Sequence, residues 1–445
     1  FNWAFARYHA GEMRLRSEDT DRERSTKAAE DAVLEGLHWL GIDWDGDVVR
    51  QSGRAELYEA AVERMIAEGA AYRCTCSKES LETRKQETIA RGDKWTYDGR
   101  CRDAAHGPDC GEHTVRIRLA ESGLLGFDDL VFGPSGQDAS EIGDRIIRRS
   151  DGGPLYHLAV VVDDIEMGIS HVIRGADHLN NTSLQIAIYR ALGADPPDYA
   201  HLPLLVGAGG KKLSKRRDPV SIQHFRDEGY LPEALISWLA RLGWSHGDQE
   251  IFTREEIVSL FQLEDVHKSN AQADVAKLTA TNQHWIKALP LDQIWPELEP
   301  HLEAVAGHPV SPSTELDRLL ELLRERSETL RRMAEQTRFF LCDEITRDEK
   351  ASAKHLKPAV RAPLADLTRR LEGVFAWDLA SIEAAFQETL AAHEGLKLGK
   401  LAQPVRVAVT GSAASPPIYD TLAILGAKRT VARLKDALEN LPASD

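Results

Sequence analysis

The sequence predicts an α/β fold in which a parallel sheet is split by an α/β insertion and followed by an all-α C-terminal half. Two apolar runs, residues 155–162 and 171–174, have the continuous character of strands buried on both faces of a parallel sheet. A polar, cysteine-containing segment at 75–153 interrupts this pattern. Beyond Pro219 the apolar residues recur at helical spacing almost to the end.

Length and charge limit the possible classes of function. The chain has 445 residues, enough for about three domains. It is 42% hydrophobic and has no apolar run of 18 residues, so we expect a globular core and no membrane span. The net charge of −16 argues against indiscriminate nucleic-acid binding, although a local basic groove remains compatible with it.

The N-terminal elements alternate between helix and strand. Residues 1–7 have the pattern of a helix that is already under way. We therefore expect that the protein has an N-terminal segment that is missing from this sequence. A strand at 12–16 leads into an acidic turn containing Glu18, which suits either a substrate ammonium or a helix cap. Two helices follow: the first has Val33, Leu37 and Leu40 on one face and ends at Gly41, and the second ends at Gly69.

The insertion carries a candidate metal site. Four of the five cysteines are clustered between Cys74 and Cys110. This pattern does not look like a secreted disulfide framework, and we expect a reducing cytoplasm. Cys74, Cys76 and Cys101 can supply three zinc ligands. The spacing leaves the fourth open among Asp103 and nearby His, Cys and Tyr side chains, and free structural cysteines are the alternative. Strands are expected around 115–119, 130–132 and 145–152.

The parallel sheet resumes after Pro154. The run 155–162 is predicted as a strand ending at Asp163 and Asp164, and 171–174 as a second strand. A helix capped near Thr182 should then bury Leu184, Ile188 and Leu192. The run 201–206 is predicted as a third strand.

A basic loop with five cations at 211–217 follows the third strand. Lysines at a strand's carboxyl end suit a polyphosphate whose charge must be neutralised. A solvated loop or a nucleic-acid patch is the alternative.

The C-terminal half is predicted to be helical. Amphipathic runs occur at 231–242, 253–261, 316–324 and 430–441. A turn rich in Gly, Ser and Pro at 410–417 is the one exception.

Taken in order, five motifs resemble bacterial glutamyl-tRNA synthetases, which are class I aminoacyl-tRNA synthetases. They are the acidic turn at 17–26, the Asp163–Asp164 pair, the run at 172–182, the Lys-Leu-Ser-Lys-Arg loop at 212–216 and the segment 397–406. Ser17 stands where that family usually has isoleucine, and Ala176 replaces a customary Glu. The family's His-Ile-Gly-His-type ATP signature would lie upstream of Phe1.

The resemblance implies ATP-dependent ligation of L-glutamate to tRNA(Glu) through a glutamyl-adenylate, with Mg²⁺, by a cytoplasmic monomer. It implies a Rossmann-type catalytic domain in two parts, 1–74 and 154–220, separated by an acceptor-binding insertion at 75–153. A helical stem-contact domain (221–300) and an all-helical anticodon-binding domain (301–445) would follow.

The resemblance also assigns roles to individual residues. Catalysis falls to Lys212, Ser214 and Lys215, and ATP binding to Asp177, Leu205, Lys212 and Lys215. Glutamate binding falls to Glu18, Tyr156 and Arg174. The alternatives are a glutamyl-queuosine tRNA(Asp) synthetase, a glutaminyl-tRNA synthetase and a non-catalytic tRNA-binding paralogue. The helical tail at 301–445 argues against the first two, and an intact Lys215 argues against the third.

Overall fold

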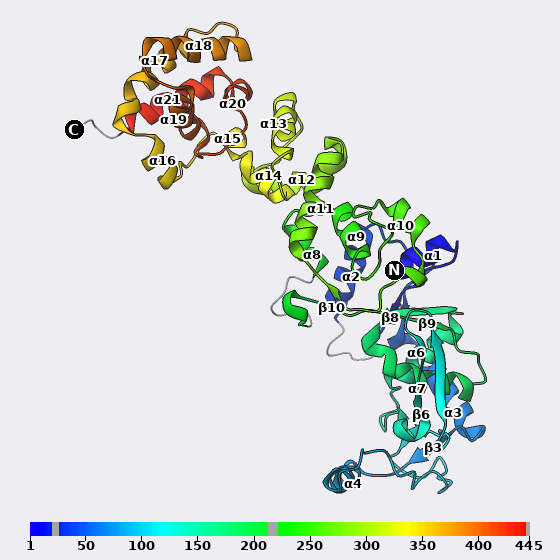
Figure 1. The fold of residues 1–445 in the computed structure, drawn as a ribbon. Coiled ribbons are helices and arrows are strands. Elements are labelled where there is room, and N and C mark those ends of the chain that lie inside the picture. Colours follow the sequence, from blue (N-terminus) through cyan, green and yellow to red (C-terminus); the bar gives the residue numbers. More distant parts are fainter. Residues whose placement is uncertain (20–25, 212–220, 442–445) are drawn as a thin grey trace. The chain divides into compact units, whose positions relative to one another are not determined.

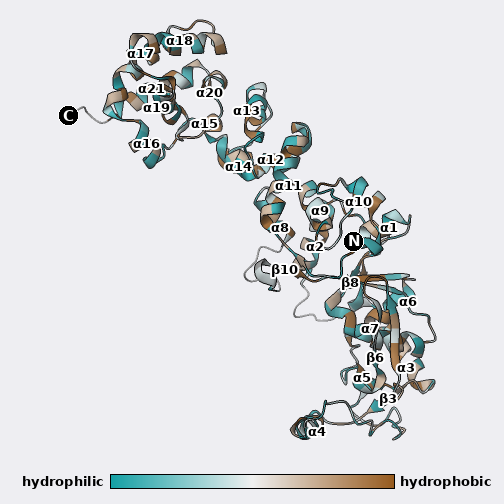
Figure 2. Ribbon diagram, viewed as in Figure 1, coloured by the Kyte–Doolittle hydropathy of each residue, from teal (hydrophilic) through white to brown (hydrophobic). Residues whose placement is uncertain are grey.

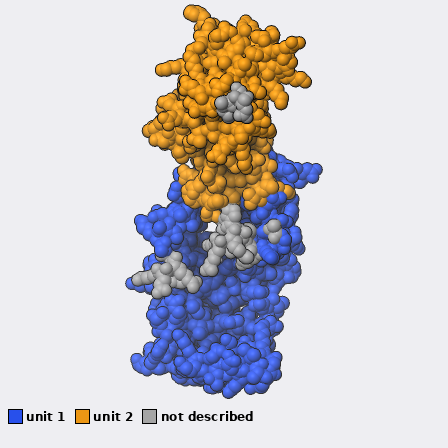
Figure 3. Space-filling view, turned by 90° about the vertical axis from the view of Figure 1, so that its left-hand side faces the viewer, with its two compact units in different colours: residues 1–218, 236–274 blue, residues 219–235, 275–445 orange. Residues whose placement is uncertain are grey.

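The structure, a computed structural model, describes residues 1–19, 26–211 and 221–441 (Figure 1). The chain divides into two compact units, shown in different colours in Figure 3. Unit 1 consists of residues 1–218 and 236–274, and unit 2 of residues 219–235 and 275–445. Residues 212–217 of the predicted basic loop and residues 20–25 of the acidic turn lie outside the described residues.

Unit 1 is built around a four-stranded sheet with the order β6-β5-β9-β8. Strand β8 (His171–Gly175) runs parallel to β9 (Asp198–Leu202), and β9 runs parallel to β5 (Leu124–Asp129). Helix α7 (Leu179–Ala191) connects β8 to β9, and β6 (Gly133–Asp138) forms an antiparallel hairpin with β5. The predicted strand at 171–174 and the burial of Leu184, Ile188 and Leu192 are confirmed, although α7 begins before Thr182.

A second parallel pair lies closer to the N-terminus. Strand β1 (Arg16–Ser17) pairs with β2 (Val49–Arg50), and helix α2 (Lys27–Trp39) lies between them in sequence. A short 3-10 helix, η1 (Gln51–Gly53), then leads into α3 (Ala55–Ala67), which buries Tyr58, Val62 and Met65. Among the described residues the parallel strands therefore form separate ladders rather than one sheet.

Two strands of the cysteine-containing segment pair with the strand that precedes it in an antiparallel sheet. Strands β3 (Ala71–Cys74), β4 (Thr114–Ile117) and β7 (Ile146–Arg148) pair in the order β3-β4-β7. The polar helix α4 (Lys78–Ala90) and a short α5 (Ala139–Ile142) complete this part.

The prediction of a strand at 155–162 is wrong, because these residues begin helix α6 (Tyr156–Glu166). The helix buries every residue from 158 to 164 against its neighbours α3 and α7. A helix with so little exposed surface lacks an amphipathic stripe, and a short apolar run cannot distinguish it from a buried strand. As a result, Asp163 and Asp164 lie in the third turn of a helix instead of at a strand end.

Four smaller predictions also need correction. Pro203 divides the predicted strand at 201–206 into the end of β9 and the short strand β10 (Leu205–Val206). The predicted strand at 12–16 is reduced to β1. Residues 130–132 form a turn, because the Asp129 carboxylate accepts the backbone N–H groups of Val131 and Phe132. Helix α2 buries none of its residues, and Val33 is 60% exposed.

A second core closes unit 1 around its N-terminal helix. Helices α1 (Asn2–Tyr8) and α10 (Arg254–Leu260) pack together, and β10 pairs with β11 (Ala271–Gln272). The buried side chains of this core include Ile173, Trp244 and Phe261. Through Ile173 this core packs against β8, the strand that also carries the candidate site residue Arg174.

All secondary-structure elements in the described residues of unit 2 are helical, as predicted. Its helices alternate hydrophilic and hydrophobic residues, as amphipathic helices do (Figure 2). Helix α9 (Pro232–Ala240) begins in unit 2 and ends in unit 1. The helices wholly in unit 2 are α8 (Ile222–Asp227), α11 (Val275–Ala288), α12 (Leu291–Ala306), α13 (Thr314–Arg324), α14 (Leu330–Gln336), α15 (Arg338–Leu341), α16 (Glu349–His355), α17 (Arg361–Glu372), α18 (Leu379–Ala392), α19 (Leu398–Thr410), α20 (Ile418–Leu425) and α21 (Ala427–Glu439).

A buried arginine joins three of these helices. From α21, Arg433 donates to the carbonyls of Phe339 and Val409 at 2.7 and 2.8 Å, and to that of Cys342 at 2.8 Å. The carbonyls at a helix C-terminus have no partner within the helix, so this guanidinium satisfies acceptors at the ends of α15 and α19. Within the described ranges, no helix is both long enough and apolar enough to cross a membrane.

Candidate active site and metal centre

A cavity of about 980 Å³ in unit 1 is lined by Glu18, Tyr156, Arg174 and Asp177. Glu18 follows β1, Tyr156 lies in the first turn of α6, and Arg174 lies on β8. Asp177 belongs to the 3-10 turn η2 (Ala176–His178). The structure thus brings all three predicted glutamate-binding side chains and one predicted ATP-binding residue around one space.

Arg174 is held by neutral hydrogen-bond partners. Its Nη2 donates to Thr182 Oγ1 at 2.7 Å and to the His178 carbonyl at 3.4 Å, and its Nε donates to His201 Nε2 at 3.1 Å. An ion pair with Asp163 or Asp177 would instead have given this side chain a structural role. Among the described residues Arg174 makes no ion pair, so its positive charge remains available to an anionic ligand.

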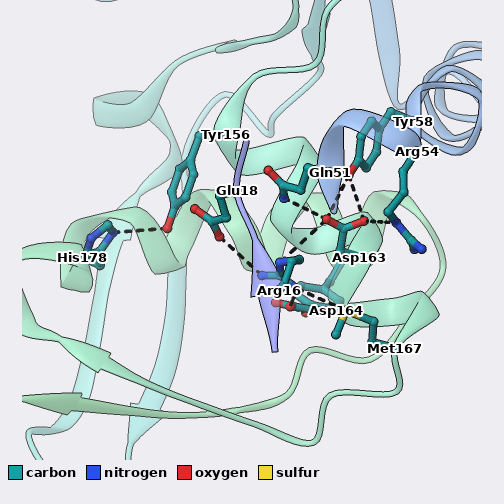
Figure 4. Close-up of polar contacts among 11 residues, drawn as sticks. Arg16, Glu18, Gln51, Arg54, Tyr58, Tyr156, Asp163, Asp164, Met167 and His178 are labelled. Atoms are coloured by element: carbon teal, nitrogen blue, oxygen red, sulfur yellow. Dashed lines mark hydrogen bonds and ion pairs between the residues drawn. The ribbon is translucent and has the colours of Figure 1, made fainter. Parts of the chain in front are cut away.

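Tyr156 and Glu18 each contact another residue that lines the cavity (Figure 4). The Tyr156 hydroxyl lies 3.3 Å from His178 Nδ1, and a Glu18 carboxylate oxygen lies 3.6 Å from Arg16 Nη2. Burial raises the pKa of Tyr156, and the nearby charge of Arg174 acts in the opposite direction. The Tyr156 hydroxyl is therefore neutral at physiological pH and can serve as a hydrogen-bond donor.

Buried carboxylates of α6 anchor β1 (Figure 4). Asp163 is fully buried and accepts hydrogen bonds from Gln51 Nε2 at 2.8 Å, Arg54 Nε at 2.7 Å and the Tyr58 hydroxyl at 3.0 Å. Asp164 accepts a 2.6 Å bond from Arg16 Nη1. We refer to these residues as the Asp163 network.

Arg16 connects the Asp163 network to the cavity. Burial lowers the pKa of Arg16, but the charges of Asp164, Glu18 and Asp163 more than compensate, so the pKa lies above its ordinary value. Its guanidinium therefore remains charged between the buried carboxylates and Glu18. The orientation of Glu18 is in this way coupled to α6.

The predicted ATP-binding residue Leu205 lines a different cavity. This space of about 400 Å³ is mostly apolar and is also bordered by Leu202, Pro203 and Ile236. Gly175 lines both cavities, so the two spaces adjoin at the end of β8. A side chain at position 175 would come within 2.7 Å of Asp177 Oδ1, which favours glycine there. Lys212, Ser214 and Lys215 lie outside the described residues.

Cys74, Cys76 and Cys101 come together at the end of β3, with their sulfur atoms all within 4.8 Å of one another. Cys76 Sγ and Cys101 Sγ are 3.6 Å apart, close to the edge of about 3.8 Å expected for a tetrahedron with zinc–sulfur bonds of about 2.3 Å. The Tyr97 hydroxyl lies 3.3 Å from Cys74 Sγ and 3.5 Å from Cys76 Sγ. The donor set therefore fits zinc.

The fourth position suits Tyr97 better than Asp103. Asp103 is a highly exposed carboxylate that pairs with Arg118 at 3.0 Å and does not belong to the clustered ligand atoms. Burial opposes ionisation of the Cys74 thiol, but hydrogen bonds from Tyr97 and Arg116 bring its pKa to about 7. Burial and its thiol neighbours raise the pKa of Cys76 to about 11. A divalent cation would offset the repulsion between neighbouring thiolates and would allow the other thiols of the cluster to ionise as well.

Several residues around the site were not predicted from the sequence. Arg16, His201 and Asp129 carried no recognisable signal, because their roles depend on which strands lie next to one another. Tyr97 was one of several possible fourth ligands, and only the fold brings its hydroxyl to the thiols.

The comparisons with known proteins agree with this geometry. Residues 1–280 match the family model of the catalytic domain of class I tRNA synthetases (E and Q), and residues 293–438 match an anticodon-binding domain. Two solved structures are similar over nearly the whole chain.

One is a glutamate tRNA ligase from Elizabethkingia meningosepticum in complex with its amino acid, with 29% sequence identity and a TM-score of 0.86. The other is a glutamate-tRNA synthetase from Elizabethkingia anophelis, with 28% identity and a TM-score of 0.82. Each alignment covers 99% of this chain and 95% of the other.

Replacing Asp163 should destabilise unit 1. We expect Asp163→Asn to lower the free energy of unfolding by about 3 kcal/mol, because it removes a buried charge that compensates Arg54. Urea unfolding followed by circular dichroism measures this loss. Glu68→Gln is the control, because it breaks only the exposed Arg64–Glu68 pair and should cost no more than about 0.5 kcal/mol. Equal losses in the two variants would contradict the role of the Asp163 network.

Metal analysis tests the thiol cluster. Protein purified without chelator should contain about one zinc per chain. Cys101→Ser should lose most of the zinc, because the substitution removes one of the roughly four ligands that a structural zinc site needs. Asp103→Ala should retain the metal, since that carboxylate pairs with Arg118. A metal-free wild type would refute the zinc site, and zinc loss in Asp103→Ala would restore Asp103 as a ligand.

Proposed function

The chain belongs to the family of class I glutamyl- and glutaminyl-tRNA synthetases, and we propose that it is a glutamate–tRNA ligase that attaches L-glutamate to tRNA(Glu). One observation carries the choice of glutamate: Arg174 lines the cavity of about 980 Å³ and has no carboxylate partner among the described residues. Glutamate and glutamine differ little in volume. The site must therefore separate them by charge, which an arginine fork does well.

The three side chains around the cavity offer polar groups that complement glutamate. Arg174 would pair with the side-chain carboxylate through charge-assisted hydrogen bonding from Nη1, since Nε and Nη2 already donate to His201, Thr182 and the His178 carbonyl. Glu18 would accept from the α-ammonium, and the Tyr156 hydroxyl would hydrogen-bond to the same substrate. An amide in place of the carboxylate would offer one acceptor and would direct an NH₂ group at the guanidinium.

The reaction would proceed in two balanced steps. First the α-carboxylate oxygen of glutamate attacks the α-phosphorus of ATP, and the bond to the β-phosphate breaks to release pyrophosphate. A terminal ribose hydroxyl of the tRNA then attacks the carbonyl of the adenylate, loses its proton and displaces AMP. Neither step needs a protein nucleophile, so the enzyme acts by positioning and by stabilising charge.

The ATP-binding residues act on the leaving group and the nucleotide. Lys215 would stabilise the charge that develops on pyrophosphate, together with Mg²⁺, while Lys212 and Ser214 would close the loop over the phosphates. Asp177 and Leu205 would contact the nucleotide from the two adjoining cavities. Zinc held by the three cysteines would be structural and would take no part in either step.

The helical C-terminal part favours tRNA(Glu) over the alternatives. A glutamyl-queuosine tRNA(Asp) synthetase would share the catalytic half, but residues 301–445 would have no role in it. A non-catalytic paralogue would not need Lys215. The anticodon-binding match at 293–438 supports recognition of the anticodon by unit 2.

Arg174→Ala should lower kcat/KM for glutamate by an amount that corresponds to a loss of roughly 3–5 kcal/mol in transition-state stabilisation. The reason is that the substitution removes one partner of a desolvated ion pair. The loss for glutamine should be far smaller. Steady-state charging of tRNA with each amino acid by the full-length protein measures both values. Arg174→Lys is a matched control that keeps the charge but loses the planar fork, and it should remain impaired. Equal losses for the two amino acids would make Arg174 a structural residue.

Lys215→Ala should slow glutamate activation by about 10²-fold with little change in glutamate affinity, because this lysine would act mainly in the transition state. Single-turnover kinetics at saturating glutamate, compared with equilibrium binding, separate the two effects. A loss of affinity as large as the loss of rate would remove Lys215 from catalysis.

A further inference from the structure

Three neighbouring strands place a buried carboxylate, an imidazole and a guanidinium in a row across the sheet of unit 1. Arg174 on β8 is in register with His201 on β9, and Asp129 ends β5 on the other side of β9. Asp129 Oδ2 lies 2.6 Å from His201 Nδ1, and Arg174 Nε lies 3.1 Å from His201 Nε2. The side chains of Asp129 and His201 are both fully buried.

These contacts determine which nitrogen of His201 carries the proton. Asp129 Oδ1 accepts the backbone N–H groups of Val131, Phe132 and His201 at 3.0, 2.8 and 3.3 Å, so only Oδ2 remains for the imidazole. Burial favours protonation of Asp129, but these bonds and the one from His201 keep its pKa below the ordinary value. An ionised carboxylate accepts only, so Nδ1 carries the hydrogen. Nε2 is then a bare acceptor that faces Arg174.

We propose that the Asp129–His201 pair is a positioning device for Arg174, which fixes the tautomer that accepts from the Arg174 Nε–H and directs the rest of the guanidinium to the amino-acid cavity. A guanidinium is a rigid fork, so restraining its Nε and Nη2 also determines where Nη1 points. Thr182 and the His178 carbonyl hold Nη2. Nη1 makes no hydrogen bond to any described residue, and it is the group available to a carboxylate.

The location of the pair supports this role. His201 lies next to the buried Ala200 in strand β9. Hydrophobic side chains in place of His201 and Asp129 would avoid the cost of desolvating a carboxylate, so stability alone does not account for the pair. Outer residues of this kind orient the groups that contact a ligand, and a small misplacement of the contacting group weakens binding. The inference rests on the proposed function, since it assigns Arg174 to the substrate's side-chain carboxylate.

Two substitutions of His201 separate positioning from stability. The amide nitrogen of an asparagine falls near the position of Nδ1, so His201→Asn can still donate to Asp129 but offers no acceptor to Arg174. The amide oxygen of a glutamine falls near Nε2, so His201→Gln keeps the acceptor for Arg174 but leaves Asp129 Oδ2 without its donor. His201→Gln should therefore be the less stable variant, because it leaves a buried carboxylate unsatisfied.

Charging of tRNA with glutamate by the full-length protein should show the opposite order. We expect His201→Asn to raise the KM for glutamate about tenfold, the scale of one hydrogen bond to a charged group, with little change in the KM for ATP. His201→Gln should change the glutamate KM less. An unchanged KM in His201→Asn, or KM values that follow the stability of the variants, would overturn the proposal.

Asp129→Asn tests the tautomer. The amide oxygen would remain with the three backbone N–H groups, so its NH₂ would face Nδ1 and move the imidazole proton to Nε2, against the Arg174 Nε–H. A comparable loss of orientation through the wrong tautomer is known for serine protease triads. The glutamate KM should rise as in His201→Asn. The control is Asp144→Asn, another buried carboxylate in unit 1, which binds Tyr72 instead, and it should leave the KM unchanged.

Long-range ¹⁵N–¹H correlation of His201 reads the tautomer without any activity. The wild type should show the proton on Nδ1 and Asp129→Asn should show it on Nε2. A wild type protonated on Nε2 would overturn the proposal whichever amino acid the enzyme charges. A wild type with the expected tautomer that fails to charge glutamate would instead refute the proposed function alone.

Discussion

The burial of Asp163 in the middle of α6 is the constraint on which the N-terminal part of unit 1 depends. A fully buried carboxylate is tolerated only if other groups compensate its charge and its lone pairs. The residues that do so come from different segments: Gln51 and Arg54 beside β2, Tyr58 on α3, and Arg16 on β1. Satisfying one carboxylate therefore fixes the short parallel pair β1–β2 against α6, although the ladder itself is only two residues long on each strand.

The same constraint prepares the cavity for a substrate with charges of both signs. Arg16 is held by Asp164 and extends toward Glu18, while Arg174 is held on the other strands by neutral acceptors. One wall thus carries a carboxylate, Glu18, that is paired with a partly buried cation, Arg16. The other carries a cation that no described carboxylate neutralises. An amino acid with an acidic side chain complements this arrangement, even though the protein as a whole has a net charge of −16.

Periodicity predicted the elements in which apolar and polar residues alternate at a regular spacing. Helix α7 is buried at residues 182–189, but Leu184, Ile188 and Leu192 recur every four residues in a run that also contains polar side chains. Helix α6 was not predicted, since its buried residues begin as one unbroken apolar run, 158–162, which has no helical period. The exposure of Val33 on α2 shows the opposite failure, because an apolar residue at helical spacing need not meet a partner.

The candidate site was predictable only where a residue belongs to a local motif. Glu18, Arg174 and the thiols follow from short runs, and the structure places them around a cavity and in a cluster. Asp129 and His201 are 72 residues apart and meet only because β5 and β9 are neighbours. Tyr97 became a better candidate than Asp103 for the fourth position of the proposed metal site only once Asp103 was seen to pair with Arg118.

The most direct test of the account is to identify which amino acid the full-length protein esterifies to tRNA, and at which nucleotide. Radiolabelled glutamate or glutamine would be incubated with ATP and bulk tRNA, and the product digested with a ribonuclease that cleaves after pyrimidines. The account predicts label from glutamate alone, released as glutamyl-adenosine from the 3′ end. Glutaminyl-adenosine, or glutamate retained on an internal nucleotide, would contradict it.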